Sequence, residues 1–390
     1  MQNQIRFNIF FRNQCVLVVT TLSSPIISIY NSVKSALNIS QPPEQYIFYC
    51  GGSWDFSSQL ISTIFSSSFL SPIISSLQTA VILERQEYGQ VDHFIKNYFA
   101  SLTYEIVQFN PARRFLHSVT NSRGFILEHM NEDVINEVLS FVPFDLLDGL
   151  EDEARLKELT RWFNKDFFKW AKDIPCHNCK SPTQPMGATN KVTIEEAENL
   201  AGNVELYKCT SCGAMTRFPR YNKTTKLLQT RIGRCGEWAN CFHAFLVALG
   251  FTARFVNDWT DHVWVEVWLD SCQSYVHVDP CENLVNRPLV YEEGWGKKLK
   301  WIVAFNQYEC VDVTKRYTNK YDEVINRRQA EIPESLVQKI IAYKNSEFLA
   351  LADEETKNEV LKKQRLDLDV LNKRKVTITP EEERPRISGS

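Results

Sequence analysis

Three short stretches between Arg234 and Pro280 contain residues that could act together as a nucleophile, a base and a group that orients the base. The first stretch is RCGEWANCFHAFLVALGF, in which apolar residues recur at helical spacing after Cys235 and Gly250 stands where a helix would end. A cysteine in the first turn of a helix lies at the positive end of the helix dipole, which favours the reactive thiolate. We therefore expect Cys235 to be a nucleophile.

The second and third stretches supply the other two roles. TDHVWVEVW alternates between valines and other side chains from His262 onward, which is typical of a strand. YVHVDP reads as another short strand that carries Asp279. A histidine that takes the thiol proton and an aspartate that fixes the imidazole tautomer would complete a catalytic relay. His277 is the alternative base, although it lies only two residues from Asp279 on one strand.

A structural interpretation of these residues has to be weighed against the catalytic one. A buried cysteine is usually inert and packs as a small apolar group. A strand histidine alone is often a satisfied core residue. The combination of a cysteine on a helix start with a histidine and an aspartate on the following strands favours catalysis.

This order of residues resembles the transglutaminase-like cysteine enzymes. The segments CGEWANCF, DHVWVEVW and VHVDPCEN narrow the resemblance to the cytosolic peptide:N-glycanase family, over roughly Leu156 to Asn326. The resemblance implies an α+β, papain-like core. It also implies an amidase that hydrolyses the side-chain amide of glycosylated asparagine through a cysteine thioester and leaves aspartate. Because that family places its base at the start of the DHVWVEV strand, the resemblance selects His262 over His277.

The resemblance further implies a cleft that binds substrate. Its expected residues are Trp170, Trp238, Arg254, Trp264 and Glu266. The backbone N–H of Cys235 and the indole of Trp170 or Trp264 are candidates for stabilising the oxyanion. A structural alternative remains for each residue, since tryptophans pack in cores and an Arg–Glu pair can join adjacent strands. Tyr275 occupies a position at which relatives carry tryptophan, so the sugar-facing surface is expected to differ there.

A second constellation consists of two CxxC pairs, Cys176 with Cys179 and Cys209 with Cys212. Four thiolates in two such knuckles match a tetrahedral, structural Zn²⁺ site, so we expect one zinc ion per chain. A redox CxxC is the alternative. The intervening segment should contain a short helix that opens with a capping box from Thr193 to Glu196. His177 could replace one cysteine, although we expect all four thiolates to bind.

Composition limits the remaining function classes. The chain has 390 residues, a formal net charge of −3 and 11 scattered cysteines. This charge does not suggest nucleic-acid binding, and no apolar run reaches the roughly 18 residues of a membrane span. Scattered cysteines with paired CxxC motifs suit a reducing compartment, so we expect a cytoplasmic or nuclear protein. The sequons at Asn38 and Asn222 would then stay unmodified.

The chain is expected to have three parts. Residues 1–87 form a small domain of hairpin (Gln4–Phe10 and Cys15–Thr20), helix (Ile27–Leu37) and strand (Thr79–Glu84), which resembles a ubiquitin-like β-grasp and implies recruitment of the proteasome or its shuttle factors. Residues 88–345 form the catalytic core, with a zinc subdomain at about 172–215. Residues 346–390 form a charged tail, helical or disordered, whose run from Asp353 to Arg374 reads as a solvated helix.

Three other functions fit parts of this pattern. A protein-crosslinking transglutaminase uses the same relay with an amine acceptor, and a cysteine protease would cleave backbone amides. The same fold also serves as a non-enzymatic scaffold in a DNA-repair protein that lacks the triad. The pairing of a zinc-type site with an intact triad favours the amidase, whose substrates would be misfolded N-glycosylated proteins bound for degradation.

Overall fold

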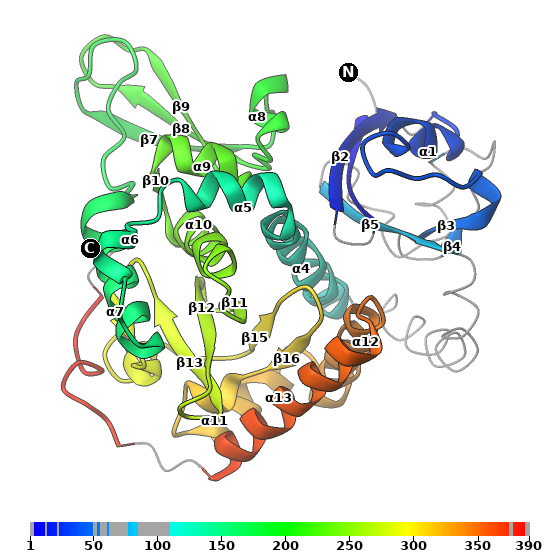
Figure 1. Ribbon diagram of the computed structural model, residues 1–390. Coiled ribbons are helices and arrows are strands. Elements are labelled where there is room, and N and C mark those ends of the chain that lie inside the picture. Colours follow the sequence, from blue (N-terminus) through cyan, green and yellow to red (C-terminus); the bar gives the residue numbers. More distant parts are fainter. Residues whose placement is uncertain are drawn as a thin grey trace. The chain divides into compact units, whose positions relative to one another are not determined.

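The computed structural model describes residues 4–11, 14–21, 23–49, 53–54, 61, 77–84, 110–373 and 377–386 (Figure 1). The chain divides into two compact units, of which one comprises residues 1–131 with 332–343 and the other comprises residues 132–331 with 344–390. This division differs from the expected boundary at residue 87, which lies outside the described residues. Among the described helices, none has the length and apolar character needed to cross a membrane.

The first unit contains a five-stranded mixed sheet in the order β2-β1-β5-β3-β4. The predicted hairpin is confirmed, since β1 and β2 are antiparallel, and β1 pairs in parallel with β5. The strands are β1 (Gln4–Phe11), β2 (Gln14–Thr21), β3 (Tyr46–Tyr49), β4 (Ser53–Trp54) and β5 (Leu77–Glu84), with helix α1 (Ile27–Val33). Phe7, Ile29 and Phe48 lie in its core. The β-grasp assignment stays a prediction. The serine-rich run Ser57–Ser76, whose composition predicts an inserted loop, lies mostly outside the described residues.

Helices complete the first unit and open the second. The first unit has α4 (Asn110–Ile126), a 3₁₀ turn η2 (Leu127–Met130) and most of α12 (Glu334–Leu349), while α5 (Glu132–Leu139) and α6 (Phe144–Leu147) begin the second. The sequence predicts a mostly helical stretch over residues 88–150, with an apolar helix face at Val134, Ile135, Val138, Leu139 and Val142. The described part of that stretch is helical, and Val134 and Val138 on α5 are buried.

A six-stranded antiparallel sheet forms the centre of the second unit, in the order β14-β13-β12-β11-β15-β16. Its strands are β11 (Ala253–Asp258), β12 (His262–Leu269), β13 (Ser274–Asp279), β14 (Leu284–Val285), β15 (Ile302–Phe305) and β16 (Cys310–Asp312). The strand assignments made from alternation are confirmed, although burial along β12 and β13 is nearly continuous because both faces of the sheet are covered.

Helix α10 (Cys235–Ala248) packs against β11 and β12 (Figure 1). The residues that cover the other face of the sheet come from the 3₁₀ turn η4 (Pro288–Tyr291), from the residues that flank a further 3₁₀ turn, η5 (Thr314–Arg316), and from α11 (Tyr321–Gln329). Helix α10 is almost wholly buried, so its apolar composition reflects packing on all sides. Gly250 adopts a φ of +81° directly after it, the left-handed conformation in which glycine ends helices.

The spacing of Leu156, Leu159, Phe163, Phe167 and Trp170 in the sequence predicts one continuous helix, but the structure interrupts it before Trp170. Helix α7 (Asp152–Trp162) gives way to a π-helical turn η3 (Phe163–Phe167), closed by a bond from the Phe168 N–H to the Phe163 carbonyl at 2.9 Å. Trp170 then lies on a short strand, β6 (Lys169–Trp170), that pairs in parallel with β10 (Ile232–Gly233). The prediction of one continuous helix was therefore wrong at its end, because the chain leaves the helix to pair with the strand before Cys235.

A three-stranded sheet, β7-β8-β9, carries the four paired cysteines. It consists of β7 (Thr183–Thr189), β8 (Val204–Cys209) and β9 (Met215–Pro219), with helices α8 (Ile194–Glu198) and α9 (Thr224–Thr230). The predicted capping box is confirmed, since the Glu196 N–H donates to the Thr193 hydroxyl at 3.2 Å and the Thr193 N–H donates to the Glu196 carboxylate at 2.8 Å.

The charged run near the end of the chain is a long helix, α13 (Glu354–Lys373), and it is not simply solvated (Figure 1). Asp367 on this helix is 3% exposed and pairs with Arg254 at 3.1 Å and with Arg316 at 2.6 Å. Arg254 also pairs with Glu309 at 2.7 Å, and Arg316 with Glu266 at 2.8 Å. The helix is therefore joined to the catalytic sheet by a buried network of charges, which the expectation of a tail from residue 346 did not include.

Replacing Asp367 by alanine should destabilise the second unit strongly. Two buried guanidinium groups would each lose a carboxylate partner, and breaking a buried pair from one side typically costs about 3–5 kcal/mol. Urea unfolding followed by tryptophan fluorescence would measure the loss. Asp369→Ala is the matched control, since Asp369 is exposed on the same helix and should change stability by less than about 0.5 kcal/mol. Equal stability of both variants would contradict a structural role for the network.

Candidate active site

Cys235 is the first residue of α10, as predicted, and it is half-buried. The preceding strand β10 fixes where it lies, because Gly233 pairs with Trp170 on β6 and its carbonyl accepts a bond from the Ala171 N–H at 2.9 Å. A Cβ atom on Gly233 would lie 2.3 Å from the Cβ of Glu237, so only glycine allows this close approach to the first turn of α10.

His262 and Asp279 form a buried pair beside the helix. His262 begins β12 and Asp279 ends the neighbouring β13, and their side chains are fully buried. The Nε2 atom of His262 lies 2.8 Å from Oδ2 of Asp279. The thiol of Cys235 lies near the imidazole, and the two groups shift each other's pKa. Since Nε2 is taken by Asp279, Nδ1 is the atom left for the thiol, and it has no hydrogen-bond partner among the described residues.

The carboxylate of Asp279 is held from several sides. Its Oδ1 atom accepts the N–H groups of Cys281 at 3.2 Å and Glu282 at 3.3 Å, and the Cys281 thiol at 3.0 Å. Its Oδ2 atom accepts the Tyr291 hydroxyl at 2.9 Å. The amide of Asn164, in the π-helical turn, donates to the carbonyl groups of Pro280 and Cys281 and so fixes the turn that follows the aspartate. Asp279 is therefore pre-organised as an acceptor.

His277 has a different role from the base considered above. Its Nδ1 atom accepts the Arg287 N–H at 3.2 Å, which leaves Nε2 to donate to the Tyr291 hydroxyl at 2.7 Å. The Tyr291 hydroxyl in turn donates to Asp279. His277 thus orients Tyr291, and it lies one hydrogen bond further from Asp279 than His262 does.

The electrostatics of the three residues favour an ion pair between thiolate and imidazolium. Burial lowers the pKa of His262, but the charge and hydrogen bond of Asp279, with the bond to Cys235, outweigh it and raise this pKa to about 9. Burial raises the pKa of Cys235, yet the hydrogen bond and charge of His262 leave it below its ordinary value. Burial also opposes ionisation of Asp279, but His262 holds the pKa of its carboxyl well below the usual range.

Of the five residues expected in a substrate cleft, only Trp170 is partly exposed, and the other four are buried. Trp170 is half-buried beside Gly233, and its Nε1 atom lacks a hydrogen-bond partner within the described part of the chain. Trp238 is 2% exposed and packs edge-on against Phe163 and Phe168, so it is a core residue. Arg254, Trp264 and Glu266 also lie in the interior.

Arg254, Trp264 and Glu266 do not line a cleft. Their exposures are 1%, 0% and 0%. Arg254 and Glu266 belong to the charge network under α13, and the Trp264 indole donates to the Tyr317 hydroxyl at 2.7 Å. The expectation that they contact substrate is therefore corrected, because each polar group is already paired inside the protein.

Tyr275 is also internal. It is 2% exposed, its hydroxyl donates to Glu309 at 2.8 Å, and the Arg254 guanidinium lies 3.4 Å from its ring centroid. Tyr275 therefore belongs to the buried network and not to a sugar-facing surface.

Sequence reasoning missed two aromatic residues that contact the catalytic pair. Tyr291 bonds Asp279, and the ring of Trp295 lies 5.0 Å from that of His262 in an edge-on arrangement. Both follow the last strand of the triad in an irregular segment without periodicity. The one available signal was an aromatic pair in the stretch YEEGWG, close after the aspartate.

The four paired cysteines converge at one point, as predicted. Their Sγ atoms lie within 4.8 Å of one another and could hold a metal ion. The measured separations are 3.6 Å for Cys176 and Cys212, 3.4 Å for Cys179 and Cys209, and 3.5 Å for Cys179 and Cys212. The N–H groups of Ser211 and Cys212 point at the Cys209 sulfur at 3.4 Å. His177 is outside the cluster, bonded to Thr216 instead.

A charge network joins the metal-site sheet to the catalytic helix. Arg220 donates two hydrogen bonds to Glu237, at 2.5 and 2.8 Å, and a third to Glu205 on β8 at 3.0 Å. Glu237 also accepts the Arg234 N–H at 2.9 Å, which caps the first turn of α10. The position of Cys235 therefore depends on contacts that originate in the cysteine-rich subdomain.

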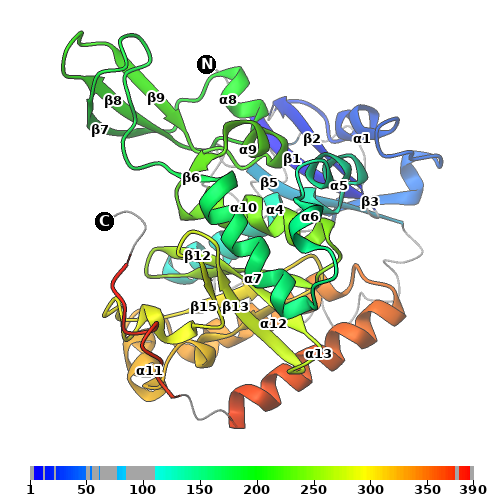
Figure 2. The ribbon, with the colours of Figure 1, turned by 60° about the vertical axis from the view of Figure 1, so that its left-hand side comes forward.

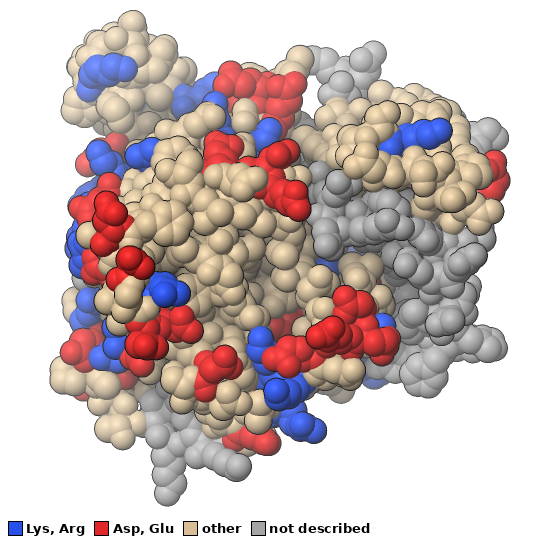
Figure 3. Space-filling view, in the orientation of Figure 1, with Lys and Arg blue, Asp and Glu red and all other residues tan. Residues whose placement is uncertain are grey.

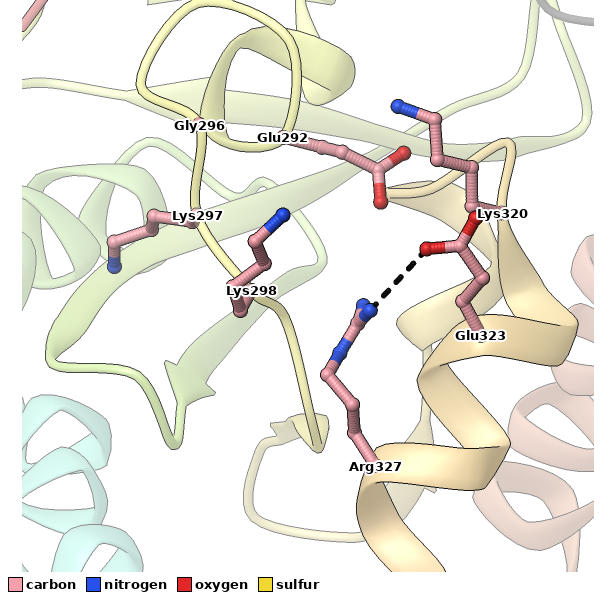
Figure 4. A pocket seen from close by; sticks show the side chains of 7 residues that line it. All are labelled: Glu292, Gly296, Lys297, Lys298, Lys320, Glu323 and Arg327. Carbon is pink, nitrogen blue, oxygen red and sulfur yellow. Dashed lines mark ion pairs between the residues drawn. The ribbon is translucent and has the colours of Figure 1, made fainter.

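A separate polar cavity of about 250 Å³ lies between η4 and α11 (Figure 4). Its lining residues are Glu292, Gly296, Lys297, Lys298, Lys320, Glu323 and Arg327. Several cations there are already paired, since Lys320 bonds Glu293 and Arg327 contacts Glu323. None of the triad residues lines this cavity. On the face shown in Figure 3, basic and acidic residues are interspersed.

Comparisons with known proteins find matches over parts of the chain. Residues 181–280 match the model of the transglutaminase-like superfamily, and residues 258–367 match that of the Rad4 transglutaminase-like domain. A Gallus gallus protein named peptide-N(4)-(N-acetyl-beta-glucosaminyl)asparagine amidase is 43% identical over 240 residues, which are 62% of this chain and 37% of that protein. The Homo sapiens protein of the same name is 42% identical over 245 residues, or 62% and 36% of the two chains.

Among solved structures, a crystal structure of Rad4-Rad23 bound to a 6-4 photoproduct UV lesion is similar, with a TM-score of 0.42 and 14% identity. It covers 68% of this chain and 59% of that one. Of the two amidases named above, the chain spans little more than a third of the length.

Replacing Asp279 by asparagine should raise the pKa of Cys235. Asparagine cannot supply the charge that holds His262 protonated, so the imidazolium that stabilises the thiolate would be lost. Alkylation of Cys235 by iodoacetamide, followed by peptide mass spectrometry as a function of pH, would show the reactive form appearing at higher pH. Asp270→Asn, at an exposed aspartate that follows β12, is the control. An unchanged alkylation curve in Asp279→Asn would contradict the pairing.

Proposed function

We propose that this transglutaminase-like protein is a peptide:N-glycanase, which hydrolyses the side-chain amide of glycosylated asparagine. The observation that carries the proposal is the buried pair in which His262 contacts Asp279 at 2.8 Å, with the Cys235 thiol near it at the start of α10. The identity of about 42% to amidases of that name supports the choice of reaction. The chain covers only 36% of the Homo sapiens protein, so the activity of that protein is a proposal for this chain.

The reaction is acyl transfer to water. The Cys235 thiolate attacks the amide carbon, and the bond to nitrogen breaks as His262 donates its proton to the leaving glycosylamine. A thioester then joins Cys235 to the former asparagine side chain. His262, now neutral, takes a proton from water, which attacks the thioester and releases aspartate. Asp279 stays ionised throughout and stabilises the imidazolium of the first step.

Two donors are available for the developing oxyanion. The backbone N–H of Cys235 belongs to the first turn of α10, where helical N–H groups have no partner within the helix. The Nε1–H of Trp170 is the second, since it is unpaired in the described structure and its residue pairs with Gly233. Trp264, the other indole considered, is excluded because Tyr317 accepts its N–H.

The alternatives are less well supported. The buried pair of His262 and Asp279 at 2.8 Å, beside a cysteine at the start of a helix, argues against a scaffold without activity, because a scaffold has no need of such a pair. Transglutaminases and cysteine proteases use the same relay. A transglutaminase would differ from the proposed enzyme in its acyl acceptor, which is an amine and not water. A cysteine protease would differ in the bond that it cleaves, which is a backbone amide. The similarity to named amidases favours water and the side-chain amide.

We further propose that the four-cysteine site holds one structural Zn²⁺ ion. Tetrahedral coordination with Zn–S bonds of about 2.3 Å places sulfur atoms roughly 3.8 Å apart. The sulfur separations of 3.4–3.6 Å are close to this value. Such a closed site contributes to folding and not to the reaction. Its effect on catalysis would reach Cys235 through the Arg220–Glu237 contact.

The biological setting is proposed from the family resemblance. Misfolded N-glycosylated proteins would be the substrates, a cytoplasmic or nuclear location would bring the enzyme to them, and proteasome subunits or shuttle factors would be partners of the N-terminal region. Co-purification with full-length protein and with a variant lacking residues 1–87 tests the partner proposal; equal recovery of proteasome from both would contradict it.

The activity is tested with a denatured high-mannose glycoprotein. Wild-type protein should remove the glycans and convert the linked asparagines to aspartate, whereas Cys235→Ala should lose at least about a thousandfold in rate. The value of kcat/KM should fall as the pH rises through about 9, because His262 then lacks the proton it donates. A native glycoprotein should react more slowly, since its linkage is less accessible.

Controls separate this proposal from its alternatives. Cys272→Ala changes an exposed cysteine outside the triad and should retain full activity. Full activity in Cys235→Ala would reject the nucleophile. Coupling of amines to glutamine with glycans left intact would favour a transglutaminase, and cleavage of the peptide backbone would favour a protease.

The metal is tested by elemental analysis of purified protein, which should give one zinc per chain. Cys209→Ser should lose the metal and much of its stability, since an incomplete thiolate set binds far less tightly. Cys241→Ser offers a comparison, because Cys241 is buried in α10 away from the cluster and should keep the zinc even where stability falls. Protein that is fully stable without any metal would reject the proposal.

A further inference from the structure

A strap of chain, residues 377–386, crosses the segment that follows the last triad strand (Figure 2). Its polar contacts reach residues 282–289. Arg384 donates to the Glu282 carbonyl at 2.5 Å, Glu381 pairs with Arg287 at 3.5 Å, and Glu382 accepts the Leu289 N–H at 2.9 Å. The strap therefore contacts the same segment that holds Asp279 and leads to Tyr291.

Glu382 is the buried anchor of the strap. It is 2% exposed, and its Oε2 atom accepts the N–H of Thr379 at 2.9 Å and its hydroxyl at 3.0 Å. Its Oε1 atom accepts the N–H of Leu289, the second residue of η4. Because Pro288 has no N–H, this is the first free donor of η4, so Glu382 caps the turn.

Gly294 provides the surface on which the strap lies. A Cβ atom there would be 2.2 Å from the Arg384 carbonyl oxygen and 2.7 Å from that of Glu382. Backbone atoms cannot yield to such a contact as a flexible side chain can. The absence of a side chain at Gly294 is therefore what lets the strap backbone dock.

The docked segment carries the two aromatic residues that contact the catalytic pair. Tyr291 ends η4 and bonds Asp279, and Trp295, one residue after Gly294, packs against His262. The strap then continues to Arg386, whose guanidinium lies 5.0 Å from the ring of Trp295 and 5.9 Å from that of Trp170. The strap thus spans from the base to the wall beside the nucleophile.

We propose that Glu382 is a positioning residue, which holds Tyr291 and Trp295 against His262 and Asp279 through η4 and Gly294. It touches no reacting atom. Its effect is to keep the imidazole–carboxylate pair fixed and shielded from water, where their attraction is strongest. The titratable and charged groups that act on this pair and on Cys235 are His277, Cys281, Tyr291, Glu237 and Arg220, and none of them belongs to the strap.

The reactivity of Cys235 tests this proposal without reference to the substrate. Although the proposal rests on the triad roles given above, iodoacetamide alkylation of Cys235 depends only on its thiolate. In Glu382→Gln and Gly294→Ala, loosening of the pair should shift the alkylation curve of Cys235 to higher pH by about one unit. Deglycosylation should slow by about tenfold in kcat, with little change in KM.

Glu381→Gln is the matched control, because Glu381 neighbours the anchor but its side chain is 55% exposed. It should leave both measurements unchanged. Limited trypsin cleavage after Arg386 reports whether the strap has left its site. Should Gly294→Ala fail to fold, Arg384→Ala, which removes the bond to Glu282, takes its place.

The outcomes separate the two proposals. A released strap with an unchanged alkylation curve would overturn the positioning role, as would a strap that remains docked after both substitutions. A shifted curve in a protein with no deglycosylating activity would support the positioning role and reject the proposed function. A change confined to KM would instead assign the strap to substrate binding.

Discussion

The buried pair of His262 and Asp279 is the interaction on which the site depends. The carboxylate and the imidazole lie 2.8 Å apart and have no exposed surface. Other groups of the protein must therefore meet the hydrogen-bonding capacity of their remaining polar atoms. Backbone N–H groups, Cys281 and Tyr291 do this for the aspartate. Burial by itself would lower the pKa of His262 and raise that of Cys235, but the charge of Asp279 raises the first and His262 in turn lowers the second.

Several remote parts of the second unit serve this pair. The cysteine-rich sheet fixes the first turn of α10 through Arg220 and Glu237, and the π-helical turn holds the loop after Asp279 through Asn164. Helix α13 holds the sheet from the other side through Asp367. Each of these contacts joins residues distant in sequence, so the catalytic geometry is a property of the whole unit and not of the three stretches that carry the triad.

Local patterns were enough to predict the elements and the chemistry, but not the tertiary contacts. Helical spacing after Cys235, alternation after His262 and the paired CxxC motifs are local signals, and the structure places those residues as expected. Burial of Trp264 was not predictable, because the sequence does not show that both faces of the sheet are covered. The role of α13 was missed for a related reason: a mostly charged helix looks solvated, although Asp367 finds its arginines far away in the chain.

The covalent step through Cys235 is the central claim, and trapping the intermediate tests it most directly. Wild-type protein mixed with a short glycopeptide and quenched rapidly in acid should contain a fraction of chains in which the deglycosylated peptide is joined as a thioester to Cys235. Mass spectrometry of the digested protein would locate this adduct. Two results would contradict the account: the Cys235→Ala variant converts the glycopeptide to the aspartate product, or the wild-type adduct lies on another residue.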